Sequence, residues 1–323
     1  MARRKANEEE YEDEYEEEYA EETIVESIST ASWRRMILVP LILVLFGFGS
    51  WMLWKKYSEE VLNHSSYILD ASNISYTSEP EWLGNRNIGE EVIELGSLES
   101  KKIHEPGLSV GIGSAFMLHP WVKEVDRVRL HYPAKIEVVL TYRKPVAFVV
   151  MPVDIYDDGK ARIMPIDSEA VVLPPEDFTP ELAQAFPRID VGDTQPIGRD
   201  FGTGWGDPVV ADAAKIAELL VEDWGELKDV LYQIQLNPRP TSTSAHADFD
   251  ILGRPGAGPN GGTLVFHWGR APGDEQSDEP PAQTKYKALK QWVEDARTNE
   301  LPLDGIDLRS IRNLQAAKSR LYR

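Results

Sequence analysis

Hydrophobic and polar residues follow different patterns along this chain of 323 residues, and the first apolar stretch is its longest. Residues 36–54 contain no charged side chain. As a helix this stretch would rise about 28 Å, close to the hydrocarbon thickness of a bilayer. Trp33, Trp51 and Trp54 lie near its ends, where indole rings favour the membrane interface. A cleaved signal peptide has a shorter apolar core nearer the N-terminus, so the pattern predicts a retained transmembrane helix.

Residues 67–144 have the pattern of a small α/β unit with the element order β-α-α-β-β. A strand is predicted within residues 67–77. Apolar residues at helical spacing predict a helix over residues 87–98, and a second, glycine-rich helix is predicted over residues 109–118, ending before Pro120. The buried face expected for the first helix consists of Ile88, Val92 and Leu95.

This unit is predicted to end in a charged hairpin, residues 119–144. In the second run of the hairpin, apolar and polar residues alternate with period two, which is typical of a half-buried strand. In the first run Val125 is out of phase with Val128, so a bulge or the start of the strand is expected near Asp126. Residues 132–134 are expected to form the turn.

From residue 145 onward, short strand-like runs separated by Gly, Pro and Asp clusters predict a mostly antiparallel β domain. Two helices interrupt these runs. The first is expected to begin at Pro208 with Asp207 as its N-cap, and the second to cover residues 283–298. The predicted fold class is therefore α+β, with one transmembrane helix, the β-α-α-β-β unit, and a β domain that carries two or more helices.

Composition narrows the possible functions. The chain has 34 Lys and Arg against 54 Asp and Glu, a net charge of -20. Nucleic-acid binding relies on basic groups, so this charge balance argues against a nucleic-acid partner. The absence of cysteine excludes disulfides, thiolate zinc sites and a cysteine nucleophile. None of the 6 histidines has metal-ligand spacing, and no phosphate loop or nucleophile elbow is present. We therefore expect no catalytic residues, no cofactor, no metal and no small-molecule substrate.

The residues before the apolar stretch are strongly acidic. Residues 7–22 are almost entirely Glu, Asp and Tyr, which is typical of a disordered, solvated tail; docking to a basic partner is the alternative. Two basic residues flank the apolar stretch on each side, so the flanking charges do not decide the orientation of the helix in the membrane. Three further basic residues weakly favour a cytoplasmic N-terminus: Arg3, Arg4 and Lys5.

Several motifs, taken in order, resemble the FtsQ/DivIB cell-division family. In the hairpin and just after it, the matching positions are Pro120, Trp121, Val122, Arg143, Pro145 and Ala147. Further matches are MPIDSEAVVLPP, PRIDVG, TLVFHWGR and GIDLRS, which begin at residues 164, 187, 263 and 305. The chain departs from the family pattern at Glu169-Ala170, where Asp/Glu-Gly is usual. The family's helical lysine corresponds to Lys285 or Lys287.

This resemblance implies a single-pass (bitopic) protein of the cytoplasmic (inner) membrane, enriched at the division site, with its N-terminus inside and its bulk outside or periplasmic. It implies a non-enzymatic scaffold that binds FtsL-like and FtsB/DivIC-like bitopic proteins near the septal transpeptidase/glycosyltransferase. A POTRA-bearing envelope translocation module and a membrane-anchored wall hydrolase are the alternatives. The implied organisation is a tail (1–35), a transmembrane helix (36–54), a stalk (55–66), a POTRA domain (67–144), a β domain (145–310) and a C-terminal tail (311–323).

The resemblance also implies two sets of functional residues. The partner contact falls on the final strand, where Ile306 and Leu308 share one face by period two, and proline at Leu308 or Ser310 is expected to break an edge ladder. That set consists of Leu303, Ile306, Asp307, Leu308, Arg309, Ser310 and Ile311. The set expected to serve POTRA recognition or packing consists of Pro120, Trp121, Val122, Arg127, Arg129, Arg143 and Pro145.

Overall fold

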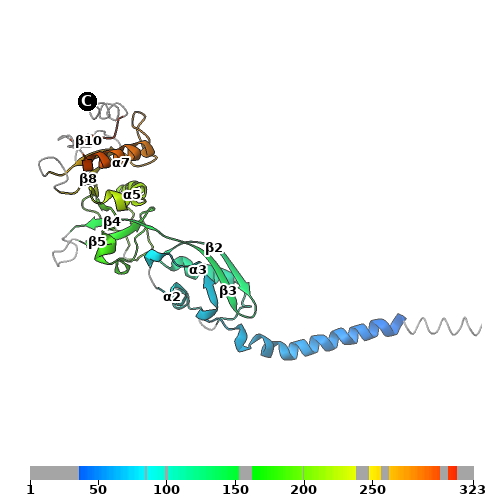
Figure 1. Cartoon of the computed structure of the whole chain (residues 1–323). Coiled ribbons are helices and arrows are strands. Elements are labelled where there is room, and N and C mark those ends of the chain that lie inside the picture. The colour runs from blue at the N-terminus through cyan, green and yellow to red at the C-terminus, as the bar shows by residue number, and fades with distance from the viewer. Residues whose placement is uncertain are drawn as a thin grey trace, which may run out of the picture. The chain divides into compact units, whose positions relative to one another are not determined.

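The computed structural model describes residues 36–83, 86–98, 101–152, 162–198, 200–237, 247–255, 262–298 and 305–310 (Figure 1). By its internal contacts the chain divides into two units, residues 1–68 and 69–323. Residues 1–35 and 311–323, the predicted tails, lie outside the described residues.

The described part of the first unit begins with a helix, Met36–Leu62, which is long and apolar enough to cross a membrane. It continues eight residues past the uncharged stretch that ends at Trp54, into the segment expected to be a stalk. The added residues are mostly polar, and they keep helical hydrogen bonding without extending the apolar span. A short 3-10 helix, η1 (Ser65–Tyr67), follows, with His64 as its N-cap.

The second unit begins with a three-stranded sheet of order β1-β3-β2. Its elements follow one another as a strand, two helices and two strands, which is the order that the hydrophobic pattern predicts. β1 pairs parallel with β3, and β2 pairs antiparallel with β3. The bounds are η2 (Ala71–Asn73), β1 (Ile74–Tyr76), η3 (Glu81–Leu83), α2 (Ile88–Leu95), α3 (Leu108–Leu118), β2 (Val122–His131) and β3 (Lys135–Tyr142).

Local sequence explains these elements, with one correction. Asn87 caps α2 by accepting a hydrogen bond from the backbone N–H of Glu90. Ile88 and Val92 are fully buried, but Leu95 is 56% exposed, so its predicted place on the buried face is wrong. Ile93, also in the last turn of the helix, is buried instead. Irregular register in β2, on either side of Val125, accounts for the phase break that the sequence showed.

A seven-stranded sheet of order β10-β9-β8-β7-β6-β4-β5 forms the rest of the described fold. β4 pairs antiparallel with β5, and β7 and β9 both pair antiparallel with β8. The other three pairings are parallel. The strand bounds are β4 (Pro145–Met151), β5 (Arg162–Asp167), β6 (Arg188–Asp190), β7 (Leu231–Leu236), β8 (Phe249–Gly253), β9 (Val265–Gly269) and β10 (Ile306–Asp307).

The expectation of a mostly antiparallel sheet is therefore corrected to a mixed sheet. The physical reason lies in the connections, because a helix that joins two neighbouring strands brings the chain back in the same direction. α5 (Pro208–Val221) joins β6 to β7, and α7 (Ala282–Thr298) joins β9 to β10. The remaining helical segments are η5 (Pro175–Asp177), α4 (Pro180–Ala183) and α6 (Trp224–Leu227).

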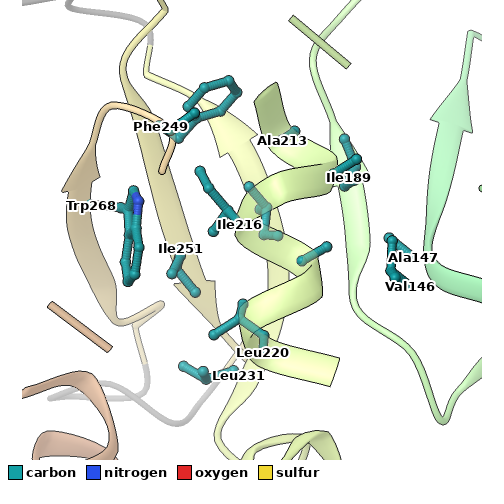
Figure 2. Close-up of a cluster of buried hydrophobic side chains, with 14 of the residues drawn as sticks. Val146, Ala147, Ile189, Ala213, Ile216, Leu220, Leu231, Phe249, Ile251 and Trp268 are labelled. Carbon is teal, nitrogen blue, oxygen red and sulfur yellow. The ribbon is translucent and has the colours of Figure 1, made fainter. Parts of the chain in front are cut away.

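One face of this sheet carries the core. Figure 2 shows Ala213, Ile216 and Leu220 of α5 directed toward the strands, among apolar side chains such as Ile189 and Ile251. All five are fully buried. Asp207 caps α5 by accepting from the backbone N–H of Val209, and Pro208 occupies the first helical position, as predicted. Leu289, Trp292 and Val293 of α7 belong to the same core.

Candidate functional site

β10 is the end strand of the seven-stranded sheet as described, and it lies where the partner contact is expected. Ile306 pairs with Phe266 and Asp307 with His267 in parallel register. The side chains of Ile306 and Leu308 are 3% and 0% exposed, so the period-two face is buried in the core. Ser310 is half-buried, and the expected contacts Leu303 and Ile311 lie outside the described residues.

Backbone geometry fixes the approach to this strand. Gly305 precedes it with a φ of +78°, in the left-handed region that favours glycine. A Cβ added there would lie 2.9 Å from the carbonyl oxygen of Val265 on β9. Glycine therefore allows the chain to come close enough to β9 to pair with it.

Asp307 and Arg309 form a compact ion pair on the opposite face. The guanidinium Nε donates to Oδ1 of Asp307 at 2.9 Å, and Nη2 donates to Oδ2 at 2.9 Å. The backbone N–H of Arg309 also donates to Oδ1 at 2.9 Å. Burial by itself raises the pKa of the Asp307 carboxyl, but the hydrogen bonds from Arg309 outweigh it and hold this pKa below its usual value.

A row of polar side chains crosses the sheet beside this ion pair. Asp250, His267 and Asp307 are register partners on β8, β9 and β10. Nδ1 of His267 lies 2.8 Å from Oδ1 of Asp250, which also accepts from Nδ2 of Asn237 at 3.0 Å. The hydrogen bond to Asp250 raises the pKa of His267. This row was not predicted from the sequence.

A signal for the row is present in the sequence. Each of its three members stands between two apolar residues, in the triplets Phe-Asp-Ile (249–251), Phe-His-Trp (266–268) and Ile-Asp-Leu (306–308). In a strand, the central residue of such a triplet faces away from the core. Three of these triplets near the C-terminus predict three polar side chains on one outer face.

A buried lysine holds the loop between β9 and α7. Lys285 is 0% exposed, and its Nζ donates to Oε1 of Glu279 at 2.6 Å and to the carbonyl oxygens of Trp268 and Arg270 at 3.2 and 3.0 Å. Burial lowers the pKa of Lys285, and the Glu279 carboxylate opposes that shift. Of the two lysines that the resemblance left open, Lys285 has the buried structural position.

Trp121 joins the hairpin to the following domain. It is 1% exposed, and its Nε1 donates to Oδ2 of Asp177 at 2.8 Å. Its ring centroid lies 5.8 Å from that of Phe178, which packs against Phe148 of β4. Trp121 is therefore a packing residue. Among the other residues of its set, Val122 and Pro145 are also buried and Pro120 is half-buried.

Arg143 stabilises the same junction through ion pairs. Its Nη1 donates to Oδ2 of Asp167 at 2.7 Å and to Glu169 at 3.3 Å. Asp167 holds the turn after β5, because its Oδ1 accepts from the backbone N–H groups of Glu169 and Val171. Ala170 in this turn has a φ of +55°. It stands where the FtsQ/DivIB motif, which the sequence resembles, usually has glycine.

A buried histidine, His119, links this junction to α2. Nε2 of His119 lies 3.0 Å from Glu91, and Nδ1 accepts from the backbone N–H of Trp121 at 3.3 Å. Arg86 binds Glu91 and also Asp177, which is the acceptor of the Trp121 indole. Burial lowers the pKa of His119, although Glu91 opposes that shift.

Arg127 and Arg129 lie on β2, an outer strand of the three-stranded sheet. Both side chains are exposed. Arg127 lines a groove of about 610 Å³ between β2 and α3, whereas Arg129 lies 3.8 Å from Glu137 on β3. Val110 and Met117 of α3 line the same groove and are 70% and 50% exposed. This groove therefore combines a strand edge with apolar surface.

Within the described ranges, no three His, Cys, Asp or Glu side chains come together in a way that would hold a metal ion. No protein-family model matches the chain, and no curated protein matches its sequence. The inference of function therefore depends on the geometry above and on the motifs in the sequence.

Proposed function

We propose that this chain is a membrane-anchored scaffold of the FtsQ/DivIB type, which binds FtsL-like and FtsB/DivIC-like bitopic proteins and helps recruit or regulate septal wall synthesis. The observation that carries the proposal is the place of β10. The segment that the resemblance assigns to partner binding forms the end strand of the described seven-stranded sheet. An end strand can accept a further strand through its backbone, which is a common mode of peptide recognition.

Two other features support the same proposal. A helix able to cross a membrane precedes the three-stranded unit, as an anchored scaffold requires. The unit itself has the β-α-α-β-β order expected of a POTRA domain. In this proposal the N-terminus is cytoplasmic, the domains lie outside the inner membrane at the division site, and the chain has no enzymatic activity, cofactor or small-molecule substrate.

The register of β10 shows which residues a partner strand would meet. The backbone N–H of Leu308 donates to the carbonyl oxygen of His267 at 2.9 Å, so it faces β9. Successive residues of a strand direct their backbone groups to opposite sides, so Asp307, the last residue of β10, directs its groups outward. Proline at Leu308 would therefore damage pairing within the chain, and the informative position for a proline substitution is Asp307.

The test uses the tagged full-length chain expressed in its own cells. Asp307→Pro removes an outward N–H, and we expect it to reduce capture of the FtsL-like and FtsB/DivIC-like proteins at least about tenfold, measured by quantitative mass spectrometry. Asp307→Ala is the matched control, because it loses the same carboxylate but keeps the N–H, and it should retain capture. Unchanged capture by a folded Asp307→Pro variant would rule out strand addition at β10.

The groove between β2 and α3 supports a second contact surface for the same function. β2 is also an outer strand, and the exposed Val110 and Met117 would receive apolar side chains of an added strand. Met117→Asp places a charge in this groove without touching β10. If this substitution abolishes partner capture while Asp307→Pro leaves it intact, β2 is the main contact.

A further inference from the structure

Two arginines of the second unit stack on the same tyrosine. The guanidinium carbons of Arg188 and Arg254 lie over the ring of Tyr232, 5.1 and 5.9 Å from its centroid. Arg188 is the first residue of β6, Tyr232 lies near the start of β7, and Arg254 directly follows β8. These strands are neighbours in the sheet, so their ends bring the three side chains together. We call this arrangement the arginine–tyrosine cluster.

Hydrogen bonds hold both arginines of the cluster in place. Nη1 of Arg188 donates to the hydroxyl of Tyr232 at 2.7 Å. Nε of Arg254 donates to the carbonyl oxygen of Lys228, and its backbone N–H donates to the carbonyl oxygen of Val230 at 2.7 Å. All these acceptors are neutral, and so is the aromatic ring. The contacts therefore orient the two guanidiniums without neutralising their charge.

Neither arginine of the cluster forms an ion pair with a carboxylate among the described residues. This is unusual in a chain that has 54 Asp and Glu for 34 Lys and Arg. The acidic residue of β6, Asp190, accepts from Nε2 of Gln233 at 3.3 Å instead. Arg254 is exposed and Arg188 is half-buried, so a ligand can reach both charges from solvent. Other described arginines do lie within ion-pair distance of a carboxylate, namely Arg86, Arg129, Arg143, Arg270 and Arg309.

We propose that the arginine–tyrosine cluster binds an acidic peptide segment of a protein partner, with carboxylates on Arg188 and Arg254. An extended segment directs alternate side chains to one face, about 7 Å apart, which is within reach of two guanidiniums held on one ring. The segment therefore has Asp or Glu at alternate positions. A long phosphate polymer is the poorer occupant, because the net charge of -20 repels polyanions. The inference goes beyond the proposed function, because the cluster needs no strand added at β10.

The experiment measures peptide affinity on the full-length chain in detergent by fluorescence anisotropy. One labelled peptide has glutamate alternating with serine, and its control has glutamine in place of every glutamate. A short linear polyphosphate serves as an unlabelled competitor. We expect the glutamate peptide to bind and the glutamine peptide not to bind. The affinity should fall as salt rises, because the attraction between exposed charges is screened.

Substitutions in the cluster separate charge from orientation. Arg188→Gln and Arg254→Gln should each weaken binding about two- to fivefold, and the double variant at least about fivefold. Tyr232→Leu keeps both charges but removes the ring and hydroxyl that orient them, so it should also weaken binding, and Tyr232→Phe should do so less. Lys135→Gln is the matched control, because it removes one exposed positive charge from β3 in the other sheet and should leave the affinity unchanged. Thermal unfolding followed by circular dichroism checks that each variant is folded.

Each contrary result identifies what fails. Equal affinity for the glutamate and glutamine peptides, or no binding of either at low salt, overturns the proposal. An equal loss of affinity in Lys135→Gln and in the double variant shows unspecific attraction and overturns it as well. Polyphosphate that displaces the peptide and itself binds more tightly, with that affinity lost in the double variant, makes a phosphate polymer the occupant instead. None of these outcomes bears on partner capture at β10, which Asp307→Pro tests separately.

Discussion

Replacing Trp121 with alanine should destabilise the unit of residues 69–323 more than most single substitutions would. The indole is 1% exposed, and a tryptophan buries about 200 Å² of surface. At about 25 cal/mol per Å² this burial contributes about 5 kcal/mol as an upper value. Replacing a core tryptophan by alanine costs about 3–5 kcal/mol, and this is the loss we expect.

A second variant separates packing from hydrogen bonding. Trp121→Phe keeps an aromatic ring against Phe178 but removes the donor to Asp177, which still binds Arg86. We expect it to cost about 1–2 kcal/mol. Leu118→Ala, at a residue 68% exposed, is the control and should change stability by less than about 0.5 kcal/mol.

The assay is urea unfolding of a fragment that begins at Lys55, followed by circular dichroism. The wild-type fragment should unfold cooperatively, because the sheets it contains carry buried cores of their own. A Trp121→Ala variant as stable as Leu118→Ala would refute the view that this indole holds the hairpin to the following domain.

Three further predictions use the same unfolding assay. Gly269→Ala should destabilise by about 2–4 kcal/mol, because φ there is +87° and an added Cβ would overlap the Glu279 carboxylate. A cost below about 0.5 kcal/mol would contradict this. Lys285→Ala should cost about 3–5 kcal/mol by leaving Glu279 as a buried charge without its ion-pair partner, and Lys287→Ala is the control. The two histidines should give opposite pH dependence. Burial lowers the pKa of His119, so the unfolded state binds its proton more tightly, and stability falls as pH drops below about 6.5. Asp250 raises the pKa of His267, so its contribution is present below about pH 6.5 and is lost as pH rises through the raised pKa. His119→Gln should flatten the acid decline, His267→Gln should flatten the decline on the alkaline side, and equal slopes in both variants would contradict the assignment.

The sequence predicted those helices and strands that have a clear cap signal or a regular spacing of apolar residues. α5 could be placed because Asp207 and Pro208 mark its start, and β3 because its apolar residues alternate. β6 was missed because it is only three residues long, Arg188–Asp190, and so short a strand has no measurable period. Its parallel pairing with both neighbours makes the sheet mixed.

At the candidate site, the prediction from sequence was limited by unknown strand register. Alternation correctly placed Ile306 and Leu308 on one face, since both side chains are buried. Alternation does not tell which backbone groups face the neighbouring strand, because that depends on register with a segment far away in sequence. The informative position for proline therefore moved from Leu308 to Asp307 only when the hydrogen bond from Leu308 to His267 was known. The polar row of Asp250 and His267 depends on register in the same way.

Hydrogen exchange of the full-length chain, with and without the FtsB/DivIC-like protein, tests the central claim most directly. If a partner strand adds to β10, the amide of Asp307 should become slower to exchange, while those of β2, Val122–His131, stay unchanged. Slower exchange confined to β2, or no change at β10 under saturating partner, would contradict the account.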